Sequence, residues 1–150
     1  MLKIDNKIYL NWDDVSNLVE VLCEKITKIP NLTYVTGLAR GGLIPAVLVS
    51  HKLNLKYTSE SSLKDLPSSN ILIIDDICDS GETLKNYKGA LSAVLHYKPN
   101  TSSVVPTIYA QEHMGNEWVI YPWERKDSKL IQDYKIEILE DLLSAKRVNK

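Results

Sequence analysis

One run of residues constrains the fold more than any other. Between Ile71 and Thr83 the chain reads ILIIDDICDSGET, four apolar residues followed by the adjacent carboxylates Asp75 and Asp76. A short loop with one glycine comes next, and an amphipathic segment follows it. A short, continuous apolar run is typical of a strand buried on both faces of a parallel sheet. Because ligands bind at the carboxyl ends of such strands, the run predicts an α/β fold with a binding site after Ile74.

Strand-like and helix-like segments alternate along the rest of the chain. We expect a hairpin over residues 1–10, helices over 11–29, 43–53, 84–95 and 129–147, and strands over 33–37, 55–57, 71–74, 103–109 and 118–121. The stretch 58–70 is polar and rich in serine, so we expect a mobile loop there. The alternation predicts a mainly parallel central sheet flanked by helices.

The composition is that of an ordinary globular protein. Of the 150 residues, 44% are apolar and 25% are charged, and the formal net charge is -1. This balance gives no overall positive field that would favour nucleic acid or a membrane surface. No apolar stretch reaches the roughly 18 residues of a transmembrane helix, and Cys23 and Cys78 form no metal-like pair. We expect a single cytoplasmic domain over residues 1–150, with reduced thiols.

The acidic strand end and the loop after it suit a phosphorylated sugar. Two carboxylates are costly to bury unpaired, but they match sugar hydroxyls or a divalent cation such as Mg²⁺. In the loop, Gly81 permits a tight turn, and the hydroxyls of Ser80 and Thr83 join the backbone N–H groups as donors to an anion. The alternative is an acidic turn that only caps a helix.

This run resembles the phosphoribosyl-pyrophosphate (PRPP) signature of the type I phosphoribosyltransferases. The resemblance implies that Asp75 and Asp76 contact the ribose hydroxyls of PRPP, and we assign both as candidate ligands of Mg²⁺. It also implies that the following loop wraps the 5′-phosphate. Asp79 matches the residue that lies near the reacting base nitrogen in that family, so it is the candidate for proton transfer.

A second motif supports the resemblance. Gly37 to Gly42, with the sequence GLARGG, lies between a predicted strand and a predicted helix and is similar to the pyrophosphate loop of the same family. Arg40 is a fork-shaped donor for pyrophosphate oxygens and is the second candidate catalytic residue. In the family the peptide bond before this basic residue is often cis, so we expect a cis bond between Ala39 and Arg40. The expected PRPP-binding residues are Ala39, Arg40, Gly41, Gly42, Asp75, Asp76, Ser80, Gly81, Glu82 and Thr83.

The segment from Trp118 to Glu124 resembles the base-binding edge of xanthine-guanine and related short purine phosphoribosyltransferases. We expect Trp118 to stack on the base, although both tryptophans of the segment could instead be core residues. Two positions differ from the family pattern. Gln111 stands where the purine enzymes carry a lysine that contacts the exocyclic oxygen of the base, and Ile120 stands where the xanthine-guanine type has an acidic residue. The expected base-binding residues are Gln111, Trp118, Val119 and Ile120.

The resemblance implies a type I phosphoribosyltransferase fold with a small hood and a C-terminal helix. It also implies a Mg²⁺-dependent enzyme that transfers the phosphoribosyl group of PRPP to a nucleobase, and we expect a purine. The products are pyrophosphate and a nucleoside 5′-monophosphate. The alternative is a non-catalytic protein of the same fold that senses PRPP or a nucleotide. We expect a homodimer or tetramer.

Overall fold

The computed structural model describes residues 1–87 and 89–125. The predicted C-terminal helix over 129–147 lies outside these residues. The described chain forms two compact units, a larger one over Asn11–Asn116 and a smaller one that combines Met1–Leu10 with the described residues from Glu117 onward. Within the described ranges, no helix has the length and apolar content needed to cross a membrane.

The larger unit is built on a parallel sheet of five strands, as predicted. The strands lie in the order β4-β3-β5-β6-β7, and every neighbouring pair is parallel. Their bounds are Tyr34–Gly37 (β3), Lys56–Tyr57 (β4), Ile71–Cys78 (β5), Leu91–Tyr97 (β6) and Ile108–Glu112 (β7). The chain runs from β3 outward to β4 and then returns to β5 on the other side of β3, so the topological switch point lies between β3 and β5.

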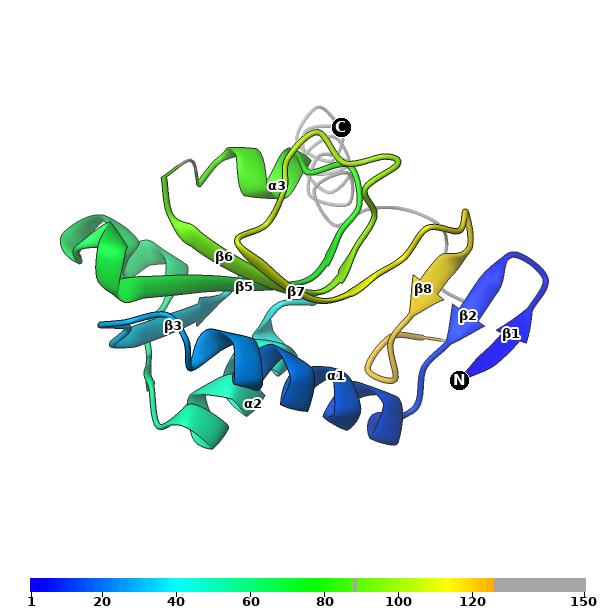
Figure 1. Cartoon of the computed structure of the whole chain (residues 1–150), viewed down its shortest axis with the longest axis horizontal. Helices are drawn as coiled ribbons and strands as arrows, with labels where there is room; N and C mark the ends of the chain where they lie inside the picture. Colours follow the sequence, from blue (N-terminus) through cyan, green and yellow to red (C-terminus); the bar gives the residue numbers. More distant parts are fainter. Residues whose placement is uncertain (88, 126–150) are drawn as a thin grey trace, which may run out of the picture. The chain divides into compact units, whose positions relative to one another are not determined.

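Helices cover both faces of this sheet. Helices α1 (Trp12–Ile26) and α2 (Leu43–Leu53) lie on one face, and α3 (Glu82–Lys85) lies on the other (Figure 1). Between β4 and β5 the chain makes two 3₁₀ helices, η1 (Glu60–Asp65) and η2 (Ser68–Asn70), in the segment for which we expect mobility. That mobility stays a prediction.

A capping box starts α1 at the predicted position. The Asp14 N–H donates to Oδ1 of Asn11 over 2.8 Å, and the Asn11 N–H donates to Oδ2 of Asp14 over 2.9 Å. The helix ends at Ile26, one turn earlier than its apolar pattern suggests. Its buried face carries Val15, Leu18, Val19, Leu22, Cys23 and Ile26, and it packs on β6 and β7.

The predicted helix over 84–95 is wrong. Helix α3 has only four residues, and a turn through Gly89 at φ 86° leads into β6 at Leu91. Residues Ala93, Val94 and Leu95 are fully buried, because β6 lies inside the sheet with a strand on each side and is covered on both faces. Apolar residues in such a strand fill every position, so some of them also match a helical spacing by coincidence.

Two other strand boundaries differ from the prediction. Strand β5 continues to Cys78, four residues beyond the predicted end. Strand β7 begins at Ile108 instead of residue 103, and the preceding residues form a loop that contains Pro106. Proline has no N–H to donate to a sheet, so its position in the loop fits its chemistry.

The smaller unit is a three-stranded sheet in the order β1-β2-β8. Strands β1 (Leu2–Ile4) and β2 (Lys7–Tyr9) form the predicted antiparallel hairpin, with Asp5 in the left-handed region at φ 53°. Strand β8 (Trp118–Ile120) pairs with β2 in parallel, with Val119 opposite Ile8. Ile8 on the central strand β2 is buried, and so are Val119 and Ile120 on β8.

Candidate active site

The two predicted loops meet at the switch point between β3 and β5. Strand β3 ends at Gly37, opposite Ile74, and the N–H of Leu38 donates to the Ile74 carbonyl over 2.9 Å. Strand β5 continues beyond that point, so Asp75 and Asp76 have β6 on one side and the loop after β3 on the other. The carboxyl end of the sheet therefore carries both motifs, where a ligand of an open α/β sheet binds.

Gly41 lies directly against the side chain of Asp76. A Cβ atom at this position would lie 2.0 Å from Oδ2 of Asp76, which is far inside van der Waals contact. Gly42 is enclosed in the same way, because its Cβ would lie 2.3 Å from the carbonyl oxygen of Ile74. The paired glycines thus allow the loop backbone to lie directly against the acidic end of β5.

The peptide bond between Ala39 and Arg40 is cis, as predicted. The loop around it is closed by backbone hydrogen bonds, from Gly42 N–H to the Leu38 carbonyl over 2.9 Å and from Leu43 N–H to the Arg40 carbonyl over 3.2 Å. Helix α2 follows immediately and holds the end of the loop.

The two carboxylates of β5 each accept a hydrogen bond from the next residue of the chain. Oδ1 of Asp75 accepts from the Asp76 N–H over 2.9 Å, and Oδ1 of Asp76 accepts from the Ile77 N–H over 2.8 Å. These contacts fix both side chains against the strand. Both residues are half-buried, which leaves part of each carboxylate accessible to a ligand.

The second loop, from Asp79 to Thr83, is supported by the segment before β7. Gly81 has φ 83°, and a Cβ there would lie 2.7 Å from Cγ2 of Val104, so both the backbone conformation and the space require glycine. The Ser80 carbonyl accepts the N–H of Ser103 over 2.9 Å and its hydroxyl over 3.0 Å. Glu82 pairs with Lys85 over 2.9 Å in the first turn after the loop.

Asp79 is held by two residues that follow β6. The hydroxyl of Thr101 lies 2.7 Å from Oδ1 and 3.0 Å from the carbonyl oxygen of Asp79, and its single proton serves one of them at a time. The ammonium group of Lys98 lies 3.8 Å from Oδ2. Lys98 is only 6% exposed, and lysine is seldom buried this deeply unless its charge is paired.

Sequence reasoning missed Lys98 because it treated the preceding strand as a helix. Gln111, which stands at the predicted base-contacting position, is exposed on β7 and pairs in register with His96. The structure places Lys98 beside Asp79, and contact of Gln111 with a base stays a prediction. A Lys-Pro pair directly after the apolar run 91–97 was the signal that could have identified the end of a second central strand.

Comparison with known proteins agrees with this geometry. No family model matches the chain. A xanthine-guanine phosphoribosyltransferase of Cereibacter sphaeroides is 32% identical in an alignment of 114 positions that covers 60% of this chain and 68% of that protein. The chain belongs to the type I phosphoribosyltransferase family.

A second relative and a solved structure extend this similarity to phosphoribosyltransferases of other organisms. The xanthine-guanine phosphoribosyltransferase of Chromohalobacter salexigens is 24% identical over 135 residues, covering 77% of this chain and 82% of that protein. The crystal structure of a purine phosphoribosyltransferase from Pyrococcus horikoshii matches with a TM-score of 0.71 and 29% identity, over 85% of this chain and all of that one. These matches confirm the predicted fold and the prediction of a phosphoribosyltransferase enzyme.

Two buried groups near this phosphoribosyltransferase site are neutral. Burial raises the pKa of the Cys78 thiol, whose Sγ lies 3.2 Å from Oγ of Ser102. Burial, with a smaller contribution from His113, lowers the pKa of His96 to about 4. Neither group adds charge to the site at neutral pH.

The other predicted base-binding residues belong to the smaller unit. Trp118 is half-buried, whereas Val119 and Ile120 are buried in the β1-β2-β8 sheet. The register places Trp118 and Ile120 on one face of β8 and Val119 on the opposite face. The rings of Tyr121 and Trp123 are stacked, with centroids 4.8 Å apart. Contact of these residues with a base stays a prediction.

Proposed function

We propose that this protein transfers the 5-phosphoribosyl group from PRPP to a purine base in a Mg²⁺-dependent reaction. The observation that carries the proposal is the close approach of Gly41 to Asp76, which joins a pyrophosphate-type loop and a ribose-type acidic pair in one site. The similarity to two xanthine-guanine enzymes and one purine enzyme supports a purine as the acceptor.

The donor would be bound by the two loops of the switch point. Asp75 and Asp76 would accept hydrogen bonds from the ribose hydroxyls, and the loop from Ser80 to Thr83 would hold the 5′-phosphate. Arg40 and the amides of Gly41 and Gly42 would bind the pyrophosphate. Arginine suits this role, because its planar fork matches two phosphate oxygens at once.

The acidic pair fits a magnesium ion that is held mainly by substrate and water. Within the described ranges, no group of three or more His, Cys, Asp or Glu residues could form an all-protein metal site. Mg²⁺ is commonly bound through one or two carboxylates together with substrate phosphates, which is what Asp75 and Asp76 offer. When bound, the ion would neutralise charge on the departing pyrophosphate.

In the reaction the bond from C1′ of the ribose to the pyrophosphate oxygen breaks, and a bond from C1′ to a ring nitrogen of the base forms. Arg40 and the loop amides would stabilise the charge that develops on pyrophosphate. The nitrogen loses a proton, and the Asp79 carboxylate would accept it. Thr101 and Lys98 support this role, because they hold both carboxylate oxygens in a fixed orientation.

We propose that Lys98 also recognises the exocyclic oxygen of the base. A buried ammonium group beside Asp79 can donate to a carbonyl oxygen at the same place where Asp79 meets the ring nitrogen. This arrangement favours a purine with an oxygen at position 6, such as hypoxanthine, guanine or xanthine, over adenine. Trp118 would stack on the base.

The test compares Lys98→Met with Gln111→Ala. Loss of the ammonium group should raise KM for an oxopurine by about tenfold or more and leave KM for PRPP nearly unchanged, because a hydrogen bond to a charged donor is worth roughly 1.5–3 kcal/mol. Gln111→Ala should change neither constant. An equal rise of KM for the oxopurine in both variants, or a rise in Gln111→Ala alone, would contradict the assignment of Lys98.

A further inference from the structure

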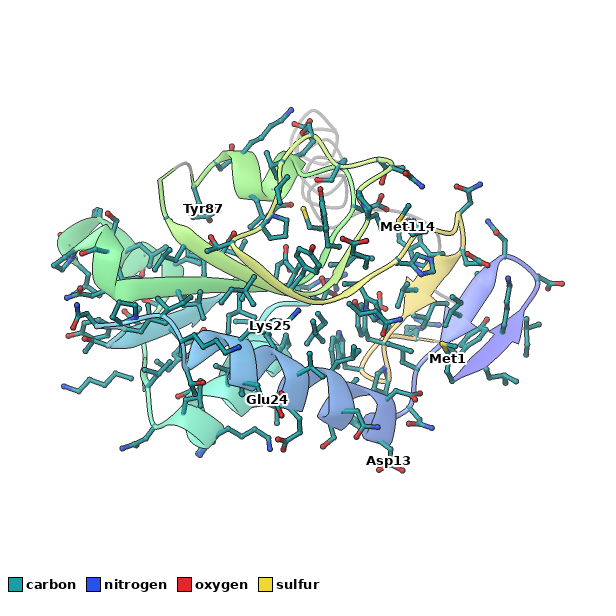
Figure 2. The ribbon with its side chains drawn as sticks, in the orientation of Figure 1. Met1, Asp13, Glu24, Lys25, Tyr87 and Met114 are labelled. Atoms are coloured by element: carbon teal, nitrogen blue, oxygen red, sulfur yellow. The ribbon has the colours of Figure 1, made fainter. Side chains whose placement is uncertain are left out.

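Glu60, at the start of η1, connects the loop after β3 with the segment that follows α3. Its Oε1 accepts the N–H of Ala39 over 3.0 Å, and its Oε2 accepts the hydroxyl of Tyr87 over 2.9 Å. Ala39 directly precedes the cis bond to Arg40. Tyr87 lies just after α3, on the same side of the sheet as that helix (Figure 2). One carboxylate thus joins three segments that are far apart in the sequence.

The contact to Ala39 differs from the other bonds that shape this loop. The N–H groups of Leu38, Gly42 and Leu43 donate to backbone carbonyls, which any sequence with this fold would offer. The N–H of Ala39 donates to a side chain instead. The orientation of the peptide group before Ala39 therefore depends on the identity of residue 60.

The contact to Tyr87 gives the carboxylate a second support. Tyr87 packs against a core cluster. This cluster contains Leu38, in the loop from Gly37 to Gly42, and Leu84, in α3. A carboxylate that accepts from both a backbone N–H and a phenol is fixed at both oxygens. Its charge strengthens both bonds, since hydrogen bonds to an ionised acceptor are about twice as strong as neutral ones.

We propose that Glu60 is a positioning residue for PRPP, which holds the Ala39–Arg40 segment in the orientation that binds pyrophosphate and ties it to the end of α3, the helix that follows the 5′-phosphate loop. This inference rests on the proposed function, because it takes the loops before α2 and α3 as the PRPP site. Glu60 does not touch the reacting atoms. It acts through the backbone of Ala39 and through Tyr87.

The test measures KM for PRPP, KM for the base and kcat in Glu60→Ala, Glu60→Gln and Tyr87→Phe. Glu60→Ala should raise KM for PRPP by about tenfold and leave KM for the base unchanged. In Glu60→Gln the amide oxygen can still accept from Ala39, and the amide N–H can donate to the Tyr87 oxygen. KM for PRPP in Glu60→Gln should therefore be close to that of the wild type. KM for PRPP in Tyr87→Phe should lie between the values for the wild type and Glu60→Ala.

Ser61→Ala is the matched control. Ser61 belongs to the same 3₁₀ helix and bonds only within its own segment to Ser59, so its removal should leave all three constants unchanged. Thermal unfolding of each variant separates an effect on PRPP from a loss of folded protein. A lower KM for PRPP in both Glu60→Ala and Glu60→Gln would overturn the inference, because it would mean that the carboxylate competes with pyrophosphate for the Ala39 amide.

Two further outcomes separate this inference from the proposed function. If the wild type neither binds PRPP nor transfers its phosphoribosyl group, the proposed function has failed, and the inference fails with it. If the wild type is active and Glu60→Ala has an unchanged KM for PRPP, only the positioning role is refuted.

Discussion

At the scale of single residues, Asp79 shows how a reactive group is set by neighbours distant in sequence. Thr101 and Lys98 lie after β6, yet they approach the two carboxylate oxygens of a residue that follows β5. Adjacent parallel strands make this possible, because their carboxyl ends meet at one edge of the sheet. The proposed proton acceptor is thus held by residues that follow the strand next to its own.

This arrangement predicts different roles for Asp79 and Thr101. Asp79→Asn should lower kcat by about 10²-fold or more, because general base catalysis contributes roughly 10²–10⁴. Thr101→Val keeps the shape of the side chain but removes the hydroxyl, and kcat should fall by about tenfold with KM for PRPP unchanged. Asn100→Ala is the control in steady-state assays, since Asn100 bonds to Met114 instead of Asp79. Equal kcat in the wild type and Thr101→Val would refute the supporting role.

Gly41 and Gly89 are glycines for different reasons: Gly41 lacks space for a side chain, whereas Gly89 has a positive φ angle. Alanine at Gly41 would displace the Asp76 carboxylate, so KM for PRPP should rise by tenfold or more. Gly89 has φ 86° and nothing within 4 Å of an added Cβ, so alanine there should cost only about 1 kcal/mol of stability. Steady-state kinetics and denaturant unfolding check both variants. A normal KM for PRPP in Gly41→Ala would show that the Asp76 position does not matter for binding.

His96 predicts a pH dependence of stability. Its pKa in the folded protein is about 4, below the unfolded value of about 6.5, so between these two pH values unfolding takes up a proton. The free energy of unfolding should therefore fall as the pH drops from about 6.5 to 4, by about 3 kcal/mol on account of this residue. Denaturant unfolding of the wild type and His96→Gln across this range should give a shallower decrease in the variant. Parallel decreases would contradict the buried neutral state of His96.

At the scale of elements, one wrong assignment accounts for most of what sequence reasoning missed. The strand–acid–loop pattern of β5, the Arg-Gly-Gly loop and α1 were all predictable, because each depends on neighbouring residues. Residues 91–95 were assigned to the end of a helix, which removed β6 from the expected sheet. The lysine at its carboxyl end, Lys98, was lost with it.

The contacts that complete the site could not be predicted from local patterns. Glu60 reaches Ala39 and Tyr87, and Thr101 reaches Asp79, only because the fold brings these segments together. Neither residue has a distinctive sequence context. An exposed glutamate and a loop threonine are ordinary residues until their partners are known.

The capping box predicts the stability of α1. Asn11→Ala should lower the free energy of unfolding by about 1 kcal/mol, because the Asp14 N–H loses its partner. Asn11→Ser should stay close to the wild type, since serine also caps helices. Denaturant unfolding measures both. Helix α1 covers one face of the sheet, where Lys25 donates to the Tyr109 carbonyl over 2.7 Å (Figure 2), so the loss should be seen in global unfolding.

At the scale of the whole molecule, the sheet order explains why the two PRPP motifs lie together although about 35 residues separate them in sequence. The proposed site combines a donor site at the β3–β5 switch point, a proton acceptor at Asp79 and a cation for the base at Lys98. The two loops at the switch point would bind the donor. The choice of base is the part that belongs to this chain.

The most direct measurement is pyrophosphate release from PRPP in the presence of Mg²⁺, with hypoxanthine, guanine, xanthine and adenine tested one at a time. We expect pyrophosphate release and a nucleoside 5′-monophosphate with at least one oxopurine, and little or no product with adenine. Activity should be lost when a chelator removes Mg²⁺. Release with adenine alone would contradict the role of Lys98. If folded protein with Mg²⁺ releases no pyrophosphate with any of these purines, the proposed function itself is contradicted.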